Sequence, residues 1–161
     1  MKPSSGKSGS SQIRADLAEL AERLSWHISM QSSLCGRLEE FADSLPAGIE
    51  TRECVLLARC ILPVLKRAHQ FEEKTLYPAI NNAFENDIEI ARTIERLRFE
   101  HWEDESYADE LGERLKELIS DPEKCNVESL AYMLRGFFEG LRRHLAFERE
   151  HLLPLLTGET S

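Results

Sequence analysis

A repeated spacing of apolar residues, at steps of three and four, restricts the fold of this chain more than any other feature. Such spacing gathers the apolar side chains on one face of an α-helix, and no segment shows the alternating pattern of a strand. The spacing continues through four long segments, at about 13–41, 51–84, 87–120 and 126–155. Because the connections between these segments are short, the sequence predicts an all-α fold, an up-down-up-down antiparallel four-helix bundle.

Breaks in this pattern indicate where the helices begin and end. Residues 45–48 and 121–122 interrupt it, and Asn126 is of a type that often caps a helix N-terminus. Residues 1–11 contain mostly Ser, Gly and Lys, so we expect a mobile N-terminal tail there and a single bundle domain at 12–157. Pro63 lies inside the second segment, where we expect a bend or a split.

Histidines lie on the apolar faces of all four predicted helices. Three of them have a glutamate four residues later, which places both side chains on one face of the helix. These pairs are His69 with Glu73, His101 with Glu105, and His144 with Glu148, while His27 stands alone on the first helix. One such pair would indicate little, because an inward histidine is usually a hydrogen-bonded core residue. With a rise of ~1.5 Å per residue, however, all four positions fall in the same central zone, within a few residues.

The chemistry of these side chains favours a metal centre in the core of the bundle. Carboxylates on an apolar face need a counter-charge, because an unpaired buried charge is costly. A mixture of imidazole and carboxylate donors favours iron, manganese or zinc over calcium and magnesium. Six or seven donors are too many for one ion, so we predict two ions bridged by carboxylates, with Glu73 and Glu148 as the bridges.

Charge and hydropathy exclude several other classes of function. The formal charge of -9 and the pI near 5.1 argue against binding to nucleic acid or to an anionic membrane surface. No apolar run approaches the ~20 residues of a membrane helix, and the first ten residues lack the apolar part of a secretory signal. The four cysteines show no Cys-x-x-Cys spacing, which favours free thiols. We expect a cytoplasmic protein.

From the first helix to the fourth, the chain resembles the hemerythrin-like (HHE cation-binding) family. The motifs are the lone His27, the block at 69–78 that ends in Leu-Tyr-Pro, Glu100-His101, and the block at 144–154 that ends in Leu-Leu-Pro. The resemblance implies a non-haem di-iron centre, with two iron ions bridged by carboxylates and an oxo or hydroxo group; manganese and zinc stay open. The positions that match its ligands are His27, His69, Glu73, His101, His144 and Glu148.

The resemblance implies a protein that reversibly binds or senses oxygen, peroxide or nitric oxide, including in a stress response. One departure bears on this: oxygen carriers of the family place two histidines one turn apart on the third helix, whereas this chain has His101 followed by Glu105. A carboxylate there could fill the coordination position that oxygen needs. Glu105, Glu72 and His151 are therefore open as ligands. A di-metal oxidase or peroxidase and an iron-sensing or storage protein are the alternative functions, and a binding protein is favoured over an enzyme.

Overall fold

The computed structural model describes residues 6–159, and every regular element in this range is helical. The elements are α1 (Gly6–Ser44), α2 (Thr51–Phe71), η1 (Glu72–Leu76), α3 (Tyr77–Ala83), α4 (Ile88–Ser120), α5 (Val127–Phe147), η2 (Glu148–Leu152) and α6 (Leu153–Thr157). The short elements η1 and η2 are single π-helical turns, in which a backbone hydrogen bond spans five residues instead of four. The prediction of an all-α fold is confirmed.

Four long helical units correspond to the four predicted segments. The second unit consists of α2, η1 and α3 in direct succession, and the fourth consists of α5, η2 and α6. α2 continues through Pro63, so the chain is not split at this residue. The change from α-helical to π-helical backbone comes only at Glu72, and it recurs at Glu148 in the fourth unit.

The first helix reaches further toward the N-terminus than the sequence indicated. It begins at Gly6, inside the segment 1–11 that we assigned to a tail, and residues 1–5 of that segment lie outside the described residues. The side chains of residues 9–16 are exposed. Helical backbone hydrogen bonds can form without tertiary contacts. Apolar periodicity therefore does not reveal these exposed turns. The mobility of the segment stays a prediction.

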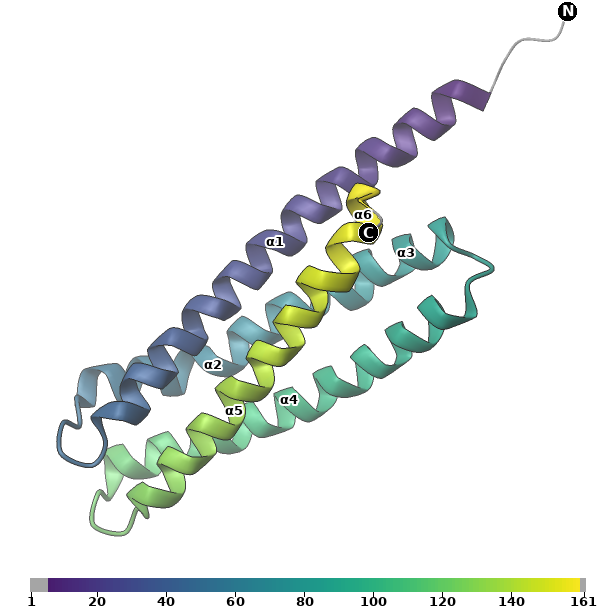
Figure 1. Ribbon diagram of the computed structural model, residues 1–161. Coiled ribbons are helices and arrows are strands. Elements are labelled where there is room, and N and C mark those ends of the chain that lie inside the picture. Colours follow the sequence, from purple (N-terminus) through teal and green to yellow (C-terminus); the bar gives the residue numbers. More distant parts are fainter. Residues whose placement is uncertain (1–5, 160–161) are drawn as a thin grey trace, which may run out of the picture.

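Figure 1 shows the four units lying side by side along a common long axis. The connections between α1 and α2 and between α4 and α5 lie at one end, and the connection between α3 and α4 lies at the opposite end. The most extensive contacts are between α2 and α4 and between α1 and α5. In the part of the chain that the structure describes, no helix is both long enough and apolar enough to cross a membrane.

Side-chain caps fix the starts of two helices that carry site residues. Asp87 Oδ1 accepts hydrogen bonds from the backbone N–H groups of Glu89 (3.0 Å) and Ile90 (3.1 Å), before α4. Asn126 Oδ1 accepts one from the N–H of Ser129 (3.0 Å) before α5, which confirms Asn126 as a cap. Each cap satisfies N–H groups that have no partner inside the helix and contributes about 1 kcal/mol. The first turns of α4 and α5 are thereby held in place.

Apolar side chains from all four units fill the interior. Leu24, Leu57, Leu97 and Leu141 are almost completely buried, and each such side chain contributes about 1.5–3 kcal/mol by leaving water. Among the residues whose burial is described, seven polar or ionisable ones are buried in the same interior: His27, Gln31, His69, Glu72, His101, His144 and Glu148. Charged groups are rarely buried unless they are paired or bind a metal.

Candidate metal centre

The two π-helical turns place one carboxylate each in the middle of the bundle. Glu72 is the first residue of η1 and Glu148 is the first residue of η2, and both are completely buried. His69 lies three residues before Glu72, and His144 lies four residues before Glu148. Single π-helical turns inside α-helices are frequent at functional sites, because they change which residues face the interior. Here each π-helical turn begins at the buried glutamate of its motif block.

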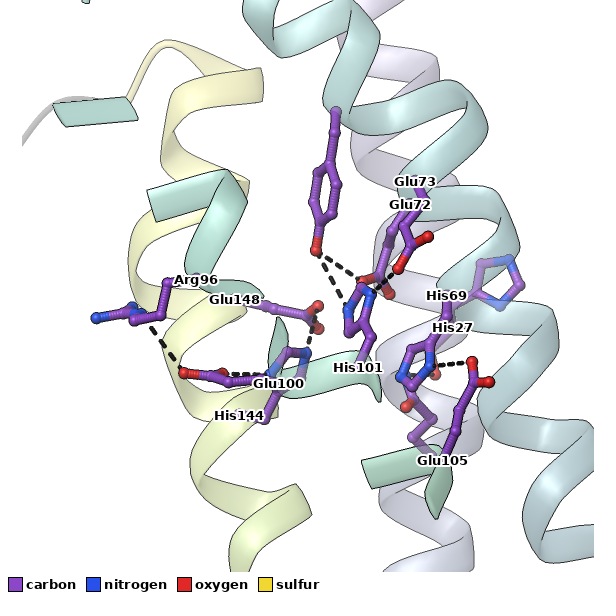
Figure 2. Close-up of polar contacts among 12 residues, drawn as sticks. His27, His69, Glu72, Glu73, Arg96, Glu100, His101, Glu105, His144 and Glu148 are labelled. Carbon is purple, nitrogen blue, oxygen red and sulfur yellow. Dashed lines mark hydrogen bonds and ion pairs between the residues drawn. The ribbon is translucent and has the colours of Figure 1, made fainter. Parts of the chain in front are cut away.

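Four buried side chains from three helical units form a compact cluster of donor atoms. They are Glu72, His101, His144 and Glu148, and one donor atom of each lies within 4.8 Å of those of the others. The shortest contacts are between His101 Nε2 and Glu72 Oε2 (2.8 Å) and between His144 Nε2 and Glu148 Oε1 (3.1 Å). Figure 2 shows these side chains directed toward one another between the helices. Two carboxylates and two imidazoles are a donor set that suits transition metals.

The imidazole of His69 lies directly beside this cluster. Its ring stacks on that of His101, with ring centroids 3.8 Å apart and planes inclined by 10°. Its Nε2 atom is buried and has no hydrogen-bond partner among the described residues. His69 therefore offers a fifth inward donor.

Each of the three central histidines has its other ring nitrogen held by a carboxylate. His69 Nδ1 lies 2.8 Å from Glu105, His101 Nδ1 lies 2.8 Å from Glu73, and His144 Nδ1 lies 3.0 Å from Glu100. These three carboxylates are 31–36% exposed, so they form the outer layer of the site. When Nδ1–H donates to a carboxylate, Nε2 keeps its lone pair for a metal, and the ring orientation is fixed. The arrangement is typical of metal-binding histidines.

Tyr77 adds a hydroxyl group to the cluster. It is completely buried at the start of α3, and its Oη donates a hydrogen bond to Glu72 Oε2 (3.1 Å). The same oxygen lies 3.3 Å from His101 Nε2. Burial, with the negative charges of Glu72 and Glu148 nearby, raises the pKa of Tyr77, so the group stays a phenol in the metal-free protein.

Protons balance the buried carboxylates in the absence of a cation. Burial opposes a charge on His144, but its hydrogen bonds to Glu100 and Glu148 outweigh burial and raise its pKa well above the usual value. Burial also opposes a charge on His101, yet its hydrogen bonds, chiefly to Glu72, raise its pKa. A metal ion would take the place of these protons, since metal-bound imidazole is neutral.

The pKa values of the other three inward donors, Glu148, Glu72 and His69, do not all shift in one direction. Burial and the charge of Glu72 together raise the pKa of Glu148 to about 7. For Glu72, burial would raise the pKa, but the hydrogen bond from His101 and the nearby imidazoles outweigh burial and lower it. Burial and the neighbouring His101 lower the pKa of His69 to about 3, so that its ring is neutral. A neutral imidazole is the form that binds metals.

Three inward atoms fit the hypothesis of a bound cation directly. His69 Nε2, Glu72 Oε1 and Glu148 Oε2 are buried without a hydrogen-bond partner among the described residues. An unsatisfied buried polar group costs about 1–3 kcal/mol, or more if it is charged, and native proteins contain few of them. All three are atom types that coordinate transition metals. The residues present therefore fit a metal centre.

The structure separates the seven predicted site residues into three groups. His101, His144 and Glu148 belong to the cluster, and His69 adjoins it. Glu73 and Glu105, predicted as metal ligands, lie outside the cluster, where each contacts the Nδ1 atom of a histidine on a neighbouring helix. The carboxylate in the cluster is that of Glu72, because η1 begins there and turns Glu72 rather than Glu73 to the interior.

His27, the last of the seven, lies outside the cluster. It is buried, and its ring stacks on Phe71 with centroids 5.0 Å apart. In Figure 2 His27 makes no dashed contact to the other labelled residues. Burial, partly offset by Glu72, lowers the pKa of His27 and keeps its ring neutral. Its role as a ligand stays a prediction.

Some features of the site were open or missing in the sequence analysis. Glu72 had been an open alternative to Glu73. His151, also left open, is exposed and packs on Phe147 at a centroid distance of 4.5 Å, outside the cluster. Tyr77 and Glu100 lie within the family motifs, but no role was predicted for either of them. Tyr77 lies five residues after Glu72, which is the spacing of the π-helical bond.

A comparison with known protein families agrees with this donor set. The family model described as Hemerythrin HHE cation binding domain matches residues 29–156. The chain belongs to the hemerythrin HHE cation-binding family. The matched range contains every residue of the cluster, together with His69 and the three outer carboxylates, whereas His27 lies just before it. No curated protein and no solved structure matches the chain significantly.

Proposed function

We propose that this HHE domain binds a di-iron centre through five inward side chains. They are His69, Glu72, His101, His144 and Glu148. The observation that carries the proposal is the set of buried partnerless atoms on His69, Glu72 and Glu148, which are costly without a cation. We also propose that the four units form the up-down-up-down antiparallel bundle, which the alternating ends of the connections in Figure 1 support.

The number and type of donors support two ions of a transition metal. Three imidazoles and two carboxylates together with the phenol of Tyr77 exceed the four ligands of a structural zinc site. Nitrogen donors in this number disfavour calcium and magnesium. Glu72 and Glu148 come from opposite motif blocks and each has a second oxygen free of partners, so both are suited to bridge two ions.

We infer that the site reversibly binds or senses oxygen, peroxide or nitric oxide. Bound iron would supply the redox chemistry for such ligands. The protein residues fix the geometry: Glu73, Glu100 and Glu105 orient the three histidines, and the site lies in the buried interior of the bundle. The contact of Glu105 with His69 Nδ1 supports a site in which Glu105 does not occupy a coordination position.

Reconstitution under anaerobic conditions tests this function. Protein loaded with Fe(II) and then exposed to air should develop a new absorption band in the near-ultraviolet or visible range, and removal of oxygen should reverse it if binding is reversible. Nitric oxide added to the anaerobic protein should also change the spectrum. A fully iron-loaded sample whose spectrum changes with none of oxygen, peroxide and nitric oxide would contradict the proposal.

A di-metal oxidase or peroxidase is the second candidate function. The observation that favours it is the hydroxyl group of Tyr77, a buried proton donor whose oxygen reaches the cluster. Repeated turnover of peroxide, with stoichiometric loss of an added reductant, would support the enzyme. A reaction that stops after one turnover in excess reductant would support the binding protein instead.

A further inference from the structure

A cleft on the outer side of His27, between α1 and α2, has a chemistry different from that of the metal centre. It consists of two adjoining hollows that share Trp26, His27 and Arg67. We call these together the α1–α2 cleft. The inner hollow has a volume of about 200 Å³, and its remaining walls are mostly apolar: Met30, Cys60, Pro63 and Val64, with Arg59 at the edge. The outer hollow is more open, and Arg23, Gln70, Phe71, Lys74 and Thr75 complete its walls.

Four cationic side chains converge on this cleft although the chain as a whole is acidic. They are Arg23, Arg59, Arg67 and Lys74. None of the four forms an ion pair with a residue that the structure describes, whereas many other arginines and lysines of the chain do. In a protein with a formal charge of -9, this local excess of unpaired positive charge favours an anion at this place.

Aromatic rings line the α1–α2 cleft next to these charges. Trp26 is 50% exposed, and its ring meets that of His27 edge to face at a centroid distance of 4.9 Å. The guanidinium group of Arg23 lies over the ring of Phe71, 4.5 Å from its centroid. An exposed tryptophan beside a mostly apolar hollow offers a surface on which a flat ring can stack. A purely inorganic anion would leave this surface unused.

We propose that the α1–α2 cleft binds an aromatic anion, with its ring in the inner hollow against Trp26 and its anionic group among Arg23, Arg67 and Lys74. The volume of about 200 Å³ suits one or two fused rings. Guanidinium groups suit this task because they pair with carboxylate or phosphate through two parallel hydrogen bonds. The cleft needs no metal ion for this binding, so it is a separate property from the proposed di-iron centre.

Calorimetry with a matched pair of ligands tests this proposal. The probes are naphthalene-2-carboxylate and its neutral isostere naphthalene-2-carboxamide, added to metal-free and to iron-loaded protein. The carboxylate should bind about tenfold or more tightly than the amide in both forms, because a charge-assisted hydrogen bond contributes more than a neutral one. Inorganic phosphate alone should bind more weakly than the carboxylate, since it lacks the ring.

Variants and a labelling experiment locate the binding. Arg23→Gln and Arg67→Gln should each weaken binding of the carboxylate by about tenfold. Arg14→Gln is the control, because it makes the same change of charge nearer the N-terminus of α1, and it should leave the affinity within about twofold. The carboxylate should also slow alkylation of Cys60, which lines the inner hollow, but not of Cys125, as read by peptide mass spectrometry. Equal affinity for both probes, binding only to iron-loaded protein, or equal effects of Arg67→Gln and Arg14→Gln would overturn the proposal.

Discussion

At the scale of single residues, the division between inward and outward carboxylates is the main result. Glu72 and Glu148 are completely buried and contact Nε2 of His101 and His144, whereas Glu73, Glu100 and Glu105 are partly exposed and contact Nδ1 atoms. The inner pair would bind metal, and the outer three would orient the imidazoles. The sequence neighbours Glu72 and Glu73 thus occupy different layers of the site.

Replacing these two neighbours by glutamine separates the roles. Glu72→Gln should lose at least one of the two metal ions, because an amide is a poor substitute for a bridging carboxylate. Glu73→Gln should keep both ions, with an affinity lowered by no more than about tenfold, since the amide oxygen can still accept from His101 Nδ1. Metal content and competition with a chelator measure both effects. Full metal content in Glu72→Gln together with loss in Glu73→Gln would reverse the assignment.

Tyr77 allows a second prediction at this scale. Tyr77→Phe removes the hydrogen bond to Glu72 Oε2 and leaves the ring packing intact, so the metal-free protein should lose about 1–3 kcal/mol of unfolding free energy. Urea unfolding measures this loss, and Tyr107→Phe is the comparison, because that hydroxyl donates to a backbone carbonyl away from the cluster. If Tyr77→Phe is as stable as the original protein, the hydroxyl does not interact with the carboxylate as described.

At the scale of helices, the sequence determined which segments are helical but not how they rotate. Apolar steps of three and four predict an unbroken α-helix, and they correctly located the four units and the cap at Asn126. They do not reveal a π-helical turn, which adds one residue without changing the kinds of residues present. The rotation at η1 is what exchanges Glu72 for Glu73 at the centre. The Nδ1 contacts depend on neighbouring helices, so spacing along one helix could not predict them.

Shortening the π-helical turn tests its role. Deletion of the exposed Lys74 should restore α-helical bonding, because a π-helical turn holds one residue more than an α-helical turn. Leu76, Tyr77 and Ile80 should then stay buried, whereas the backbone that carries Glu72 and Glu73 changes, so the affinity for metal should fall by about tenfold or more. Lys74→Ala removes the same side chain at constant length and should leave the affinity for metal within about twofold. Metal content and competition with a chelator measure both effects. Equal metal affinity of the deletion and Lys74→Ala would mean that the π-helical turn is dispensable.

At the scale of the whole molecule, the bundle places several ionisable groups where only protons or a metal can balance them. His101 and His144 have a raised pKa and Glu148 has one of about 7. For a group whose pKa is raised in the folded state, the free energy of unfolding falls as the pH rises through that pKa. The lowered pKa of His69 has the opposite effect on the free energy of unfolding, but only at pH values below 6.5, the usual pKa of histidine. The metal-free protein should therefore become less stable as pH rises above 6.5.

Metal binding should depend on pH with the opposite sign. Since a cation must displace protons from His101 and His144, the affinity for metal should increase as pH rises, and binding should release protons. The rise in melting temperature caused by metal should accordingly be larger at higher pH. Calorimetry in two buffers of different ionisation enthalpy counts the released protons. If the affinity for metal does not change with pH, or if metal does not change the melting temperature, then His101 and His144 do not bind the metal.

The number of metal ions per chain is the direct test of a di-iron centre. Protein purified without chelator and reconstituted anaerobically with Fe(II) should contain two iron ions per chain by elemental analysis, and Glu72→Gln should contain fewer under the same conditions. One zinc ion per chain, or no stoichiometric metal after reconstitution of the folded protein, would contradict a di-iron centre built from the five inward side chains.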